Sequence, residues 1–191
     1  MKPNFAIIGC GRIAKRHAEQ INKVGKLIAV CDIVRENASE LAGIYGAKTY
    51  STIEELLAKE PTVDVVSICT PNGVHAEHSI LALKANKHVL CEKPLCISVA
   101  DAKEMVETAN ILDKKLFVVK QNRYNPPVQI VKQLLEDDKL GTIFSFQINC
   151  FWNRPLNIIP TAGRAHAKWM EELYLLSSVI LWTCCIGFWV M

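Results

Sequence analysis

The chain of 191 residues has no Cys-x-x-Cys pair, no internal repeat, no low-complexity linker and no stripe of basic residues. Lys and Arg alternate with Asp and Glu and the formal net charge is only +3, so nothing indicates a nucleic-acid partner. The opening residues MKPNFAIIG lack the apolar run and cleavage site of a signal peptide, and we expect none. The eight cysteines lack metal-ligand spacing, which predicts reduced, partly buried thiols of a cytoplasmic protein and no metal site, rather than a disulfide or zinc framework.

The first 120 residues alternate between short apolar runs rich in β-branched residues and amphipathic stretches. Thr52 with Glu55, and Ser98 with Asp101, have the spacing of capping boxes and mark helix starts. Strands that alternate with helices and are apolar throughout predict a parallel sheet covered on both faces. The fold class is therefore α/β, a Rossmann fold with a doubly wound parallel sheet. The predicted strands are 5–9, 27–31, 63–69, 88–91 and 116–120, and the predicted helices are 12–23, 34–45, 74–85 and 98–112.

The pattern changes after Lys120. A Pro-containing connection at 124–127 precedes a predicted helix at 128–137, and Gly141 marks a turn. Residues 142–152 alternate in hydrophobicity like a strand of a different sheet. We therefore expect a Rossmann domain at 1–122 and the start of an α+β open-sheet second domain at 123–155.

A glycine-rich turn at 9–14 reads Gly-Cys-Gly-Arg-Ile-Ala, follows an apolar strand and opens a helix. In a dinucleotide-binding turn of this form, Gly9 permits the tight bend, Gly11 lets the backbone approach a pyrophosphate, and Ala14 lets the helix pack on the strand. The phosphates then bind free N–H groups at the helix N-terminus. The alternative is an ordinary strand-to-helix turn built from small residues.

Asp32 ends the second predicted strand, 23 residues after Gly9. An acidic residue at this place accepts hydrogen bonds from the adenosine ribose hydroxyls and repels a 2′-phosphate, which favours NAD over NADP. Arg35 lies close by in the sequence and keeps NADP open as the less favoured cofactor. A surface aspartate in a turn is the other interpretation.

Two further motifs close the next strands: Ile-Cys-Thr-Pro-Asn-Gly-Val-His at 68–75 and His-Val-Leu-Cys-Glu-Lys-Pro at 88–94. With the glycine-rich turn, they make residues 1–155 resemble the Gfo/Idh/MocA family, which includes glucose–fructose oxidoreductase and inositol dehydrogenase. The resemblance implies an NAD(P)-dependent oxidoreductase that oxidises a hydroxyl of a sugar or sugar nucleotide. Residues 120–127 and 149–155 resemble the branch that oxidises the 3-hydroxyl of UDP-N-acetylglucosaminuronate in bacterial surface-polysaccharide synthesis.

The resemblance also implies residue roles. Lys93 is the expected catalytic residue, with its cation at the substrate hydroxyl beside the nicotinamide, whereas on its own it reads as a solvated lysine at a strand end. Glu92 either contacts the nicotinamide ribose or holds Lys93 in place. His75 has a structural or a cofactor role, and His17 is expected to be structural. The expected cofactor contacts are Gly9, Cys10, Gly11, Arg12, Ile13, Asp32, Thr70, Pro71, Asn72, His75, Glu92, Lys93 and Gln121.

Expected substrate contacts are Lys93, Asn122 and Arg123. Arg123 lies at the domain junction and either clamps a carboxylate or diphosphate or forms an interdomain salt bridge. Pro94 fixes the chain direction after its strand, and the peptide bond before it is cis in many relatives. Full-length relatives assemble into homo-oligomers. A non-catalytic NAD-binding protein and an inositol or aldose dehydrogenase remain alternative functions.

The end of the chain departs from the family pattern. Complete members are longer, and their second domain supplies a catalytic histidine. The expected continuation around that histidine resembles W-x-G-x-x-K-M-D-G-G-x-L-x-x-Q-x-S-H-x-x-D-L-x-x-W. This chain has Trp169-Met170-Glu171-Glu172 instead. Back-translation in a shifted reading frame forces Asp and Gly codons where that pattern requires them. We therefore expect 156–191 to be a frameshifted, non-native tail, and the chain to bind NAD with little turnover. The alternative is a C-terminal membrane anchor at 173–191, which carries no charge.

Overall fold

The computed structural model describes residues 2–145, 147 and 149. These fall into two compact units, one ending at Val119 and one beginning at Lys120. The expected division into domains at 1–122, 123–155 and 156–191 stays a prediction, and the expected tail lies outside the described residues.

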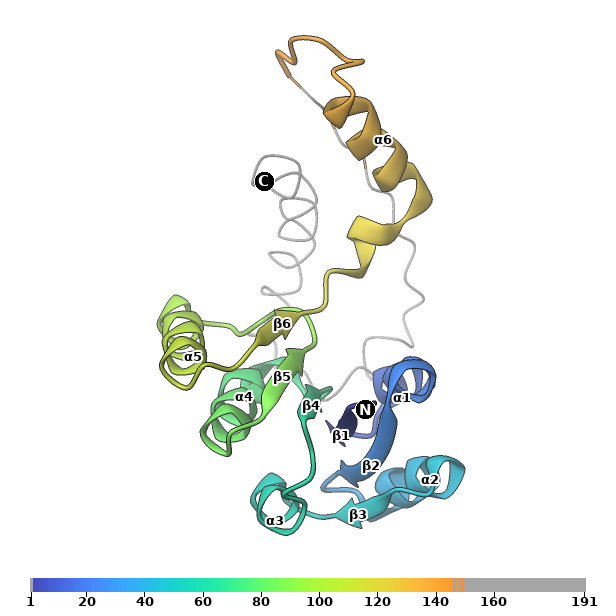
Figure 1. Cartoon of the computed structure of the whole chain (residues 1–191), viewed down its shortest axis with the longest axis vertical. Coiled ribbons are helices and arrows are strands. Elements are labelled where there is room, and N and C mark those ends of the chain that lie inside the picture. The colour runs from blue at the N-terminus through green and yellow to red at the C-terminus, as the bar shows by residue number, and fades with distance from the viewer. Residues whose placement is uncertain (1, 146, 148, 150–191) are drawn as a thin grey trace. The chain divides into compact units, whose positions relative to one another are not determined.

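A sheet of six parallel strands forms the centre of the first unit, in the order β3-β2-β1-β4-β5-β6 (Figure 1). The strands are β1 (Asn4–Ile8), β2 (Lys26–Cys31), β3 (Lys48–Tyr50), β4 (Val65–Ile68), β5 (His88–Cys91) and β6 (Leu116–Val118). This is the strand order of a Rossmann fold, so the predicted fold class is confirmed. The chain order reverses between β1 and β4, and ligands of such sheets bind beyond the carboxyl ends of the strands at this point.

Helices cover both faces of the sheet. Figure 1 shows α1 and α2 on one side and α3, α4 and α5 on the other. Neighbouring residues of β1 therefore enter different cores: Ile7 packs in the cluster that contains Leu41 of α2, and Ile8 in the cluster that contains Leu56 of α3. This explains why the strands at the centre of the sheet are apolar throughout. The helices are α1 (Arg12–Val24), α2 (Arg35–Tyr45), α3 (Ile53–Lys59), α4 (His75–Lys84) and α5 (Val99–Ile111).

The two predicted helix caps are confirmed. The Thr52 hydroxyl accepts the backbone N–H of Glu55 at 3.2 Å, and the Ser98 hydroxyl accepts that of Asp101 at 3.0 Å. Each satisfies a donor that the first turn of a helix leaves free. The helix that Thr52 begins, α3, is only seven residues long, and the apolar periodicity did not predict its extent.

β3 was not predicted. Its residues are Lys48, Thr49 and Tyr50, of which the first two are exposed, so the apolar run that marks the other strands is missing. It lies at the edge of the sheet, where only one neighbouring strand buries it.

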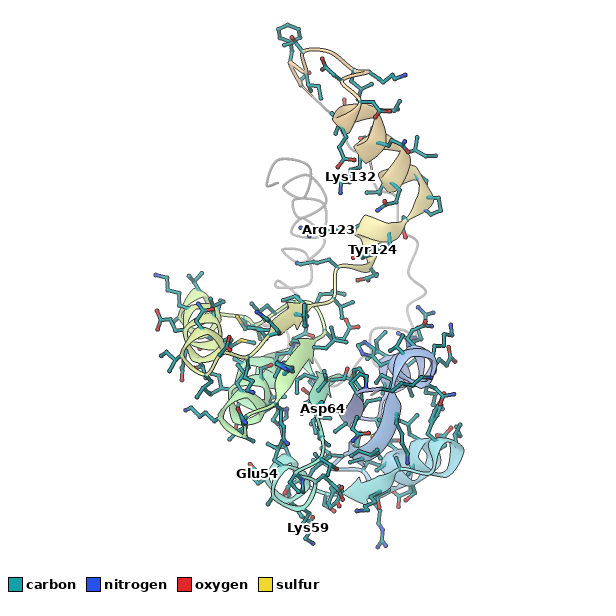
Figure 2. All side chains as sticks on the ribbon, in the orientation of Figure 1. Glu54, Lys59, Asp64, Arg123, Tyr124 and Lys132 are labelled. Atoms are coloured by element: carbon teal, nitrogen blue, oxygen red, sulfur yellow. The ribbon has the colours of Figure 1, made fainter. Side chains whose placement is uncertain are left out.

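Asp64 precedes β4 and lies at the amino-terminal edge of the sheet, where β1 begins (Figure 2). Its carboxylate accepts the backbone N–H of Asn4 at 2.7 Å and so joins β1 to β4.

The second unit contains a 3₁₀ turn (Gln121–Tyr124) and α6 (Pro126–Glu136). α6 begins two residues before the predicted helix because Pro126 and Pro127 occupy the first helical positions, where no N–H is needed. No residue of α6 is buried.

The strand predicted at 142–152 is not formed by its described residues, 142–145, 147 and 149. A strand needs a neighbour for its backbone groups, and the described part of the second unit offers none. The other residues of that prediction lie outside the described part. None of the described helices is both long and apolar enough to span a bilayer, and the alternative anchor at 173–191 is outside this part of the chain.

Candidate functional site

The glycine-rich turn requires its first glycine for two reasons. Gly9 has φ of +87°, a conformation that side chains disfavour, and a Cβ there would lie 2.8 Å from the carbonyl carbon and oxygen of Cys69. Its own N–H donates to the Cys31 carbonyl at 2.8 Å. The turn after β1 is thus pressed between the ends of β2 and β4.

Gly11, unlike Gly9, has open surroundings. A Cβ at this position would have no atom of the described residues within 4 Å, and Gly11 caps α1 without any side-chain hydrogen bond. No acidic residue stands in the first turn of the helix, and Ala14 is fully buried against the sheet. The N-terminus of this 13-residue helix carries no acidic residue and, among the described residues, the space beside Gly11 is unfilled, which suits the phosphates of a dinucleotide. The residues fit the cofactor that the sequence predicted.

Asp32 lies directly after β2 and supports the same turn. Its two carboxylate oxygens accept the backbone N–H groups of Cys10 at 2.6 Å and Val34 at 2.8 Å. A carboxylate has about four acceptor positions, so both bonds leave capacity for hydroxyl groups. Asp32 is half-buried beside the glycine-rich turn, where the ribose contact is expected.

The loops after β4 and β5 are joined through a buried histidine. His75, only 1% exposed, has Nε2 2.8 Å from the Thr70 carbonyl oxygen and Nδ1 2.7 Å from that of Pro94. Carbonyl oxygens only accept, so a neutral ring satisfies one contact and a doubly protonated ring satisfies both. This geometry favours the structural interpretation of His75. Pro71 and Asn72 follow Thr70 at this edge of the sheet, and their cofactor contacts stay a prediction.

Glu92 is a buried carboxylate with two partners. Its Oε1 lies 2.8 Å from Nε2 of His17, and its Oε2 accepts the backbone N–H of Lys93 at 3.1 Å. Burial alone acts to raise the pKa of Glu92, but the hydrogen bonds from His17 and the Lys93 amide outweigh burial and hold the pKa below its ordinary value. The hydrogen bond to the Lys93 N–H is compatible with Glu92 holding Lys93 in place, and the choice between this role and a contact with the nicotinamide ribose stays a prediction.

His17 and Ser67 were not predicted as part of the site. His17 Nδ1 lies 2.7 Å from the Ser67 hydroxyl, and a contact between residues 50 positions apart leaves no local trace in the sequence. One signal was present: His17 lies between Ala14 and Ala18 on the buried stripe of α1. A polar side chain on such a stripe needs a partner.

Lys93 is half-exposed, and the peptide bond between it and Pro94 is cis. Within the described part of the chain, its ammonium group makes no hydrogen bond or salt bridge. A cation placed in this way is available to a ligand.

The buried cysteines of the described chain are not candidates for nucleophilic chemistry. All five described cysteines are free thiols, and four of them are buried. Burial raises the pKa of Cys10 to about 12, of Cys31 to about 11, and of Cys69 and Cys91 to about 12. These thiols stay protonated at neutral pH, and Cys10 therefore takes part in the turn through its backbone N–H.

Gln121, Asn122 and Arg123 belong to the second unit, in the turn before α6 (Figure 2). The Arg123 carbonyl accepts a hydrogen bond from the Gln129 side chain. Their expected contacts with cofactor and substrate stay predictions, as do those of Arg12 and Ile13 at the start of α1.

Comparison with known proteins identifies the first unit. Residues 3–120, more than half of the chain, match the GFO_IDH_MocA oxidoreductase family with an NAD-binding Rossmann fold. Glucose-6-phosphate 3-dehydrogenase of Bacillus subtilis is 36% identical over 147 residues, which cover 76% of this chain and 41% of that protein. Myo-inositol 2-dehydrogenase of Thermotoga maritima is 33% identical over 140 residues, which cover 72% and 42%.

Solved structures show the same relationship. The WlbA dehydrogenase of Chromobacterium violaceum, crystallised with NADH and UDP-GlcNAcA, has a TM-score of 0.81 and 37% identity, covering 85% of this chain and 48% of that one. The WlbA dehydrogenase of Bordetella pertussis, with the same ligands, has a TM-score of 0.70 and 34% identity, covering 74% and 44%. The chain spans less than half the length of these relatives. It belongs to the Gfo/Idh/MocA oxidoreductase family, and its first unit is an NAD-binding Rossmann domain of that family.

Proposed function

We propose that the chain is the cofactor-binding part of an NAD-dependent dehydrogenase that oxidises a hydroxyl of a sugar or sugar nucleotide. The observation that carries the proposal is the position of three loops at one edge of the sheet. β1, β4 and β5 are neighbours and parallel, so the glycine-rich turn, Thr70 and Lys93 follow their carboxyl ends side by side. This arrangement suits a diphosphate at one end and a reacting hydroxyl at the other.

The reaction class assigns a role to Lys93. Oxidation of an alcohol removes a hydride from carbon and a proton from oxygen and leaves a carbonyl group. NAD supplies the hydride acceptor when it is bound. The Lys93 ammonium contacts the hydroxyl oxygen and stabilises the negative charge that develops on it as the hydroxyl proton passes to solvent water. Glu92 holds the Lys93 backbone, and Asp32 selects a ribose without a 2′-phosphate.

For the substrate we propose the 3-hydroxyl of UDP-N-acetylglucosaminuronate. Two observations support this choice: the residues at 120–127 and 149–155 that resemble this branch, and the two similar structures crystallised with UDP-GlcNAcA. The similarity to a myo-inositol 2-dehydrogenase favours a polyol as the second candidate. We also keep the proposal that 156–191 come from a shifted reading frame. Sequencing the gene downstream of codon 155 tests it, because the shifted frame must encode the family continuation.

A chimera tests the dehydrogenase function. In it, residues 1–119 of this chain replace the Rossmann domain of the Chromobacterium violaceum WlbA dehydrogenase. We expect the chimera to form NADH when given UDP-GlcNAcA and NAD, and we expect Lys93→Met to lower kcat by at least about a hundredfold. Lys15→Met, a surface substitution on α1, is the matched control. A chimera that binds NADH but is insensitive to Lys93→Met would refute the role of Lys93.

A further inference from the structure

Three polar side chains from three separate elements meet inside the first unit: His17 from α1, Ser67 from β4 and Glu92 from the end of β5. The side chains of His17 and Glu92 are only 9% and 11% exposed. Neither the cofactor contacts nor the substrate contacts described above explain why a histidine lies there. A buried ionised carboxylate is costly unless it is paired and hydrogen-bonded, so the histidine has an energetic reason to be present.

The partners determine where the proton of His17 lies. The Glu92 carboxylate only accepts, so Nε2 must carry a hydrogen in either charge state of the ring. The Ser67 hydroxyl can either donate to Nδ1 or accept from it. Ser67 therefore keeps the ring oriented, and Nε2 donates to Glu92 whether the ring is neutral or protonated.

The same carboxylate also contacts the catalytic segment. Glu92 uses one oxygen for His17 and the other for the backbone N–H of Lys93. A continuous path of hydrogen bonds thus runs from the helix that opens at the phosphate cradle to the segment that carries the catalytic ammonium.

We propose that His17 is a positioning residue for Lys93. It fixes the Glu92 carboxylate so that this group holds the Lys93 backbone, and it thereby couples the diphosphate-binding helix to the catalytic loop. This inference rests on the proposed function and extends it, because Lys93 acts on substrate only if its main chain keeps one position beside the nicotinamide. His17 itself touches neither cofactor nor substrate.

Two isosteric substitutions separate the two contacts of the ring. In His17→Asn the amide reaches the position of Nδ1, which keeps the Ser67 contact and loses the Glu92 contact. In His17→Gln the longer amide reaches the position of Nε2 and restores a donor to Glu92. Both variants keep a polar, uncharged side chain at the same site, so general effects on α1 are matched.

Amide hydrogen exchange, measured by NMR on the whole chain, gives the readout. The Lys93 N–H, which Glu92 accepts, is compared with the Cys69 N–H, which donates to the Ile8 carbonyl at 2.8 Å in the same sheet. A loss of general stability accelerates both amides together, whereas a loss of positioning accelerates Lys93 alone.

We expect His17→Asn to accelerate exchange at Lys93 by about tenfold relative to Cys69, the effect of weakening one charge-assisted hydrogen bond. We expect His17→Gln to keep the ratio near that of the unmodified chain. His88→Gln is the control: this histidine begins β5, at the opposite edge of the sheet, and accepts the Lys115 N–H. Equal ratios in His17→Asn and the unmodified chain, or parallel acceleration of both amides, would overturn the proposal.

A second measurement separates this inference from the proposed function. Acylation of Lys93 by an amine-reactive reagent, followed by mass spectrometry, is compared with and without NADH. If NADH does not shield Lys93 in the unmodified chain, the proposed site is wrong, while the exchange ratios still decide whether His17 positions Lys93. If NADH shields Lys93 in the unmodified chain and in His17→Gln but less in His17→Asn, both proposals are supported.

Discussion

At the scale of single residues, the two glycines of the turn have different physical duties. Gly9 satisfies the protein itself, because its positive φ and its contact with Cys69 leave no room for a side chain. The described residues leave the space beside Gly11 unfilled, so we expect Gly11 to matter for the ligand and not for folding. The sequence motif shows the same residue type at both positions, and the structure indicates that one glycine is needed for the fold and the other for the ligand.

Substituting each glycine by alanine tests this separation. Gly9→Ala places a Cβ 2.8 Å from backbone atoms at positive φ, so we expect the free energy of unfolding to fall by about 1–3 kcal/mol or more. Gly11 has φ of −71°, which alanine also adopts, so we expect Gly11→Ala to change the free energy of unfolding by less than about 1 kcal/mol. We expect the same substitution to weaken NADH binding by about tenfold, because one close contact to the diphosphate is lost. Urea unfolding and NADH titration measure the two effects. Strong NADH binding by Gly11→Ala would place the phosphates elsewhere.

At the scale of elements, the sequence predicted every strand that an apolar run marks and missed the one without such a run. β1, β2, β4, β5 and the partly exposed edge strand β6 were predicted within two residues. β3 was missed because its residues are mostly exposed. The motifs named the ends of the strands at the site, but not the contact between His17 and Glu92, which lie 75 residues apart and meet only when the sheet is assembled.

We proposed that Asp32, in the loop after β2, selects the cofactor, and Asp32→Asn tests this role. The amide keeps the shape but loses the charge and one of the two acceptors for the Cys10 and Val34 N–H groups. We expect NADH affinity to fall about tenfold and the preference for NADH over NADPH to shrink, since nothing then repels a 2′-phosphate. Competitive titration with both dinucleotides measures the ratio.

Asp64→Asn is the matched control for Asp32→Asn. Asp64 also accepts a backbone N–H, that of Asn4 at 2.7 Å, but it lies at the amino-terminal edge of the sheet. We expect it to leave the NADH-to-NADPH ratio unchanged. The same change of ratio in both variants would show that Asp32 acts through stability and not through charge at the ribose.

At the scale of the whole molecule, the hydrophobic core of the described chain belongs entirely to the first unit. Its buried apolar residues run from Phe5 to Ala109, whereas α6 buries none, and Ile130 and Phe144 are exposed. The described start of the second unit therefore has apolar surface without a core of its own.

A fragment of residues 1–122 tests this distribution. We expect it to unfold cooperatively, to bind NADH with the dissociation constant of the whole chain, and to be more soluble, because the exposed apolar side chains of α6 are gone. Circular dichroism on heating and NADH titration check the first two points, and the concentration left in solution after centrifugation checks the third. A fragment without a cooperative transition would show that the first unit depends on later residues.

The two outer strands bear on how such a fragment behaves when concentrated. β3 and β6 border the sheet, and each contains only three residues, so few backbone N–H and C=O groups stand open along either border. A strand of another molecule could therefore form only a few backbone hydrogen bonds with either edge strand. We therefore expect the short edge strands to limit strand-to-strand aggregation of the isolated Rossmann domain at high concentration.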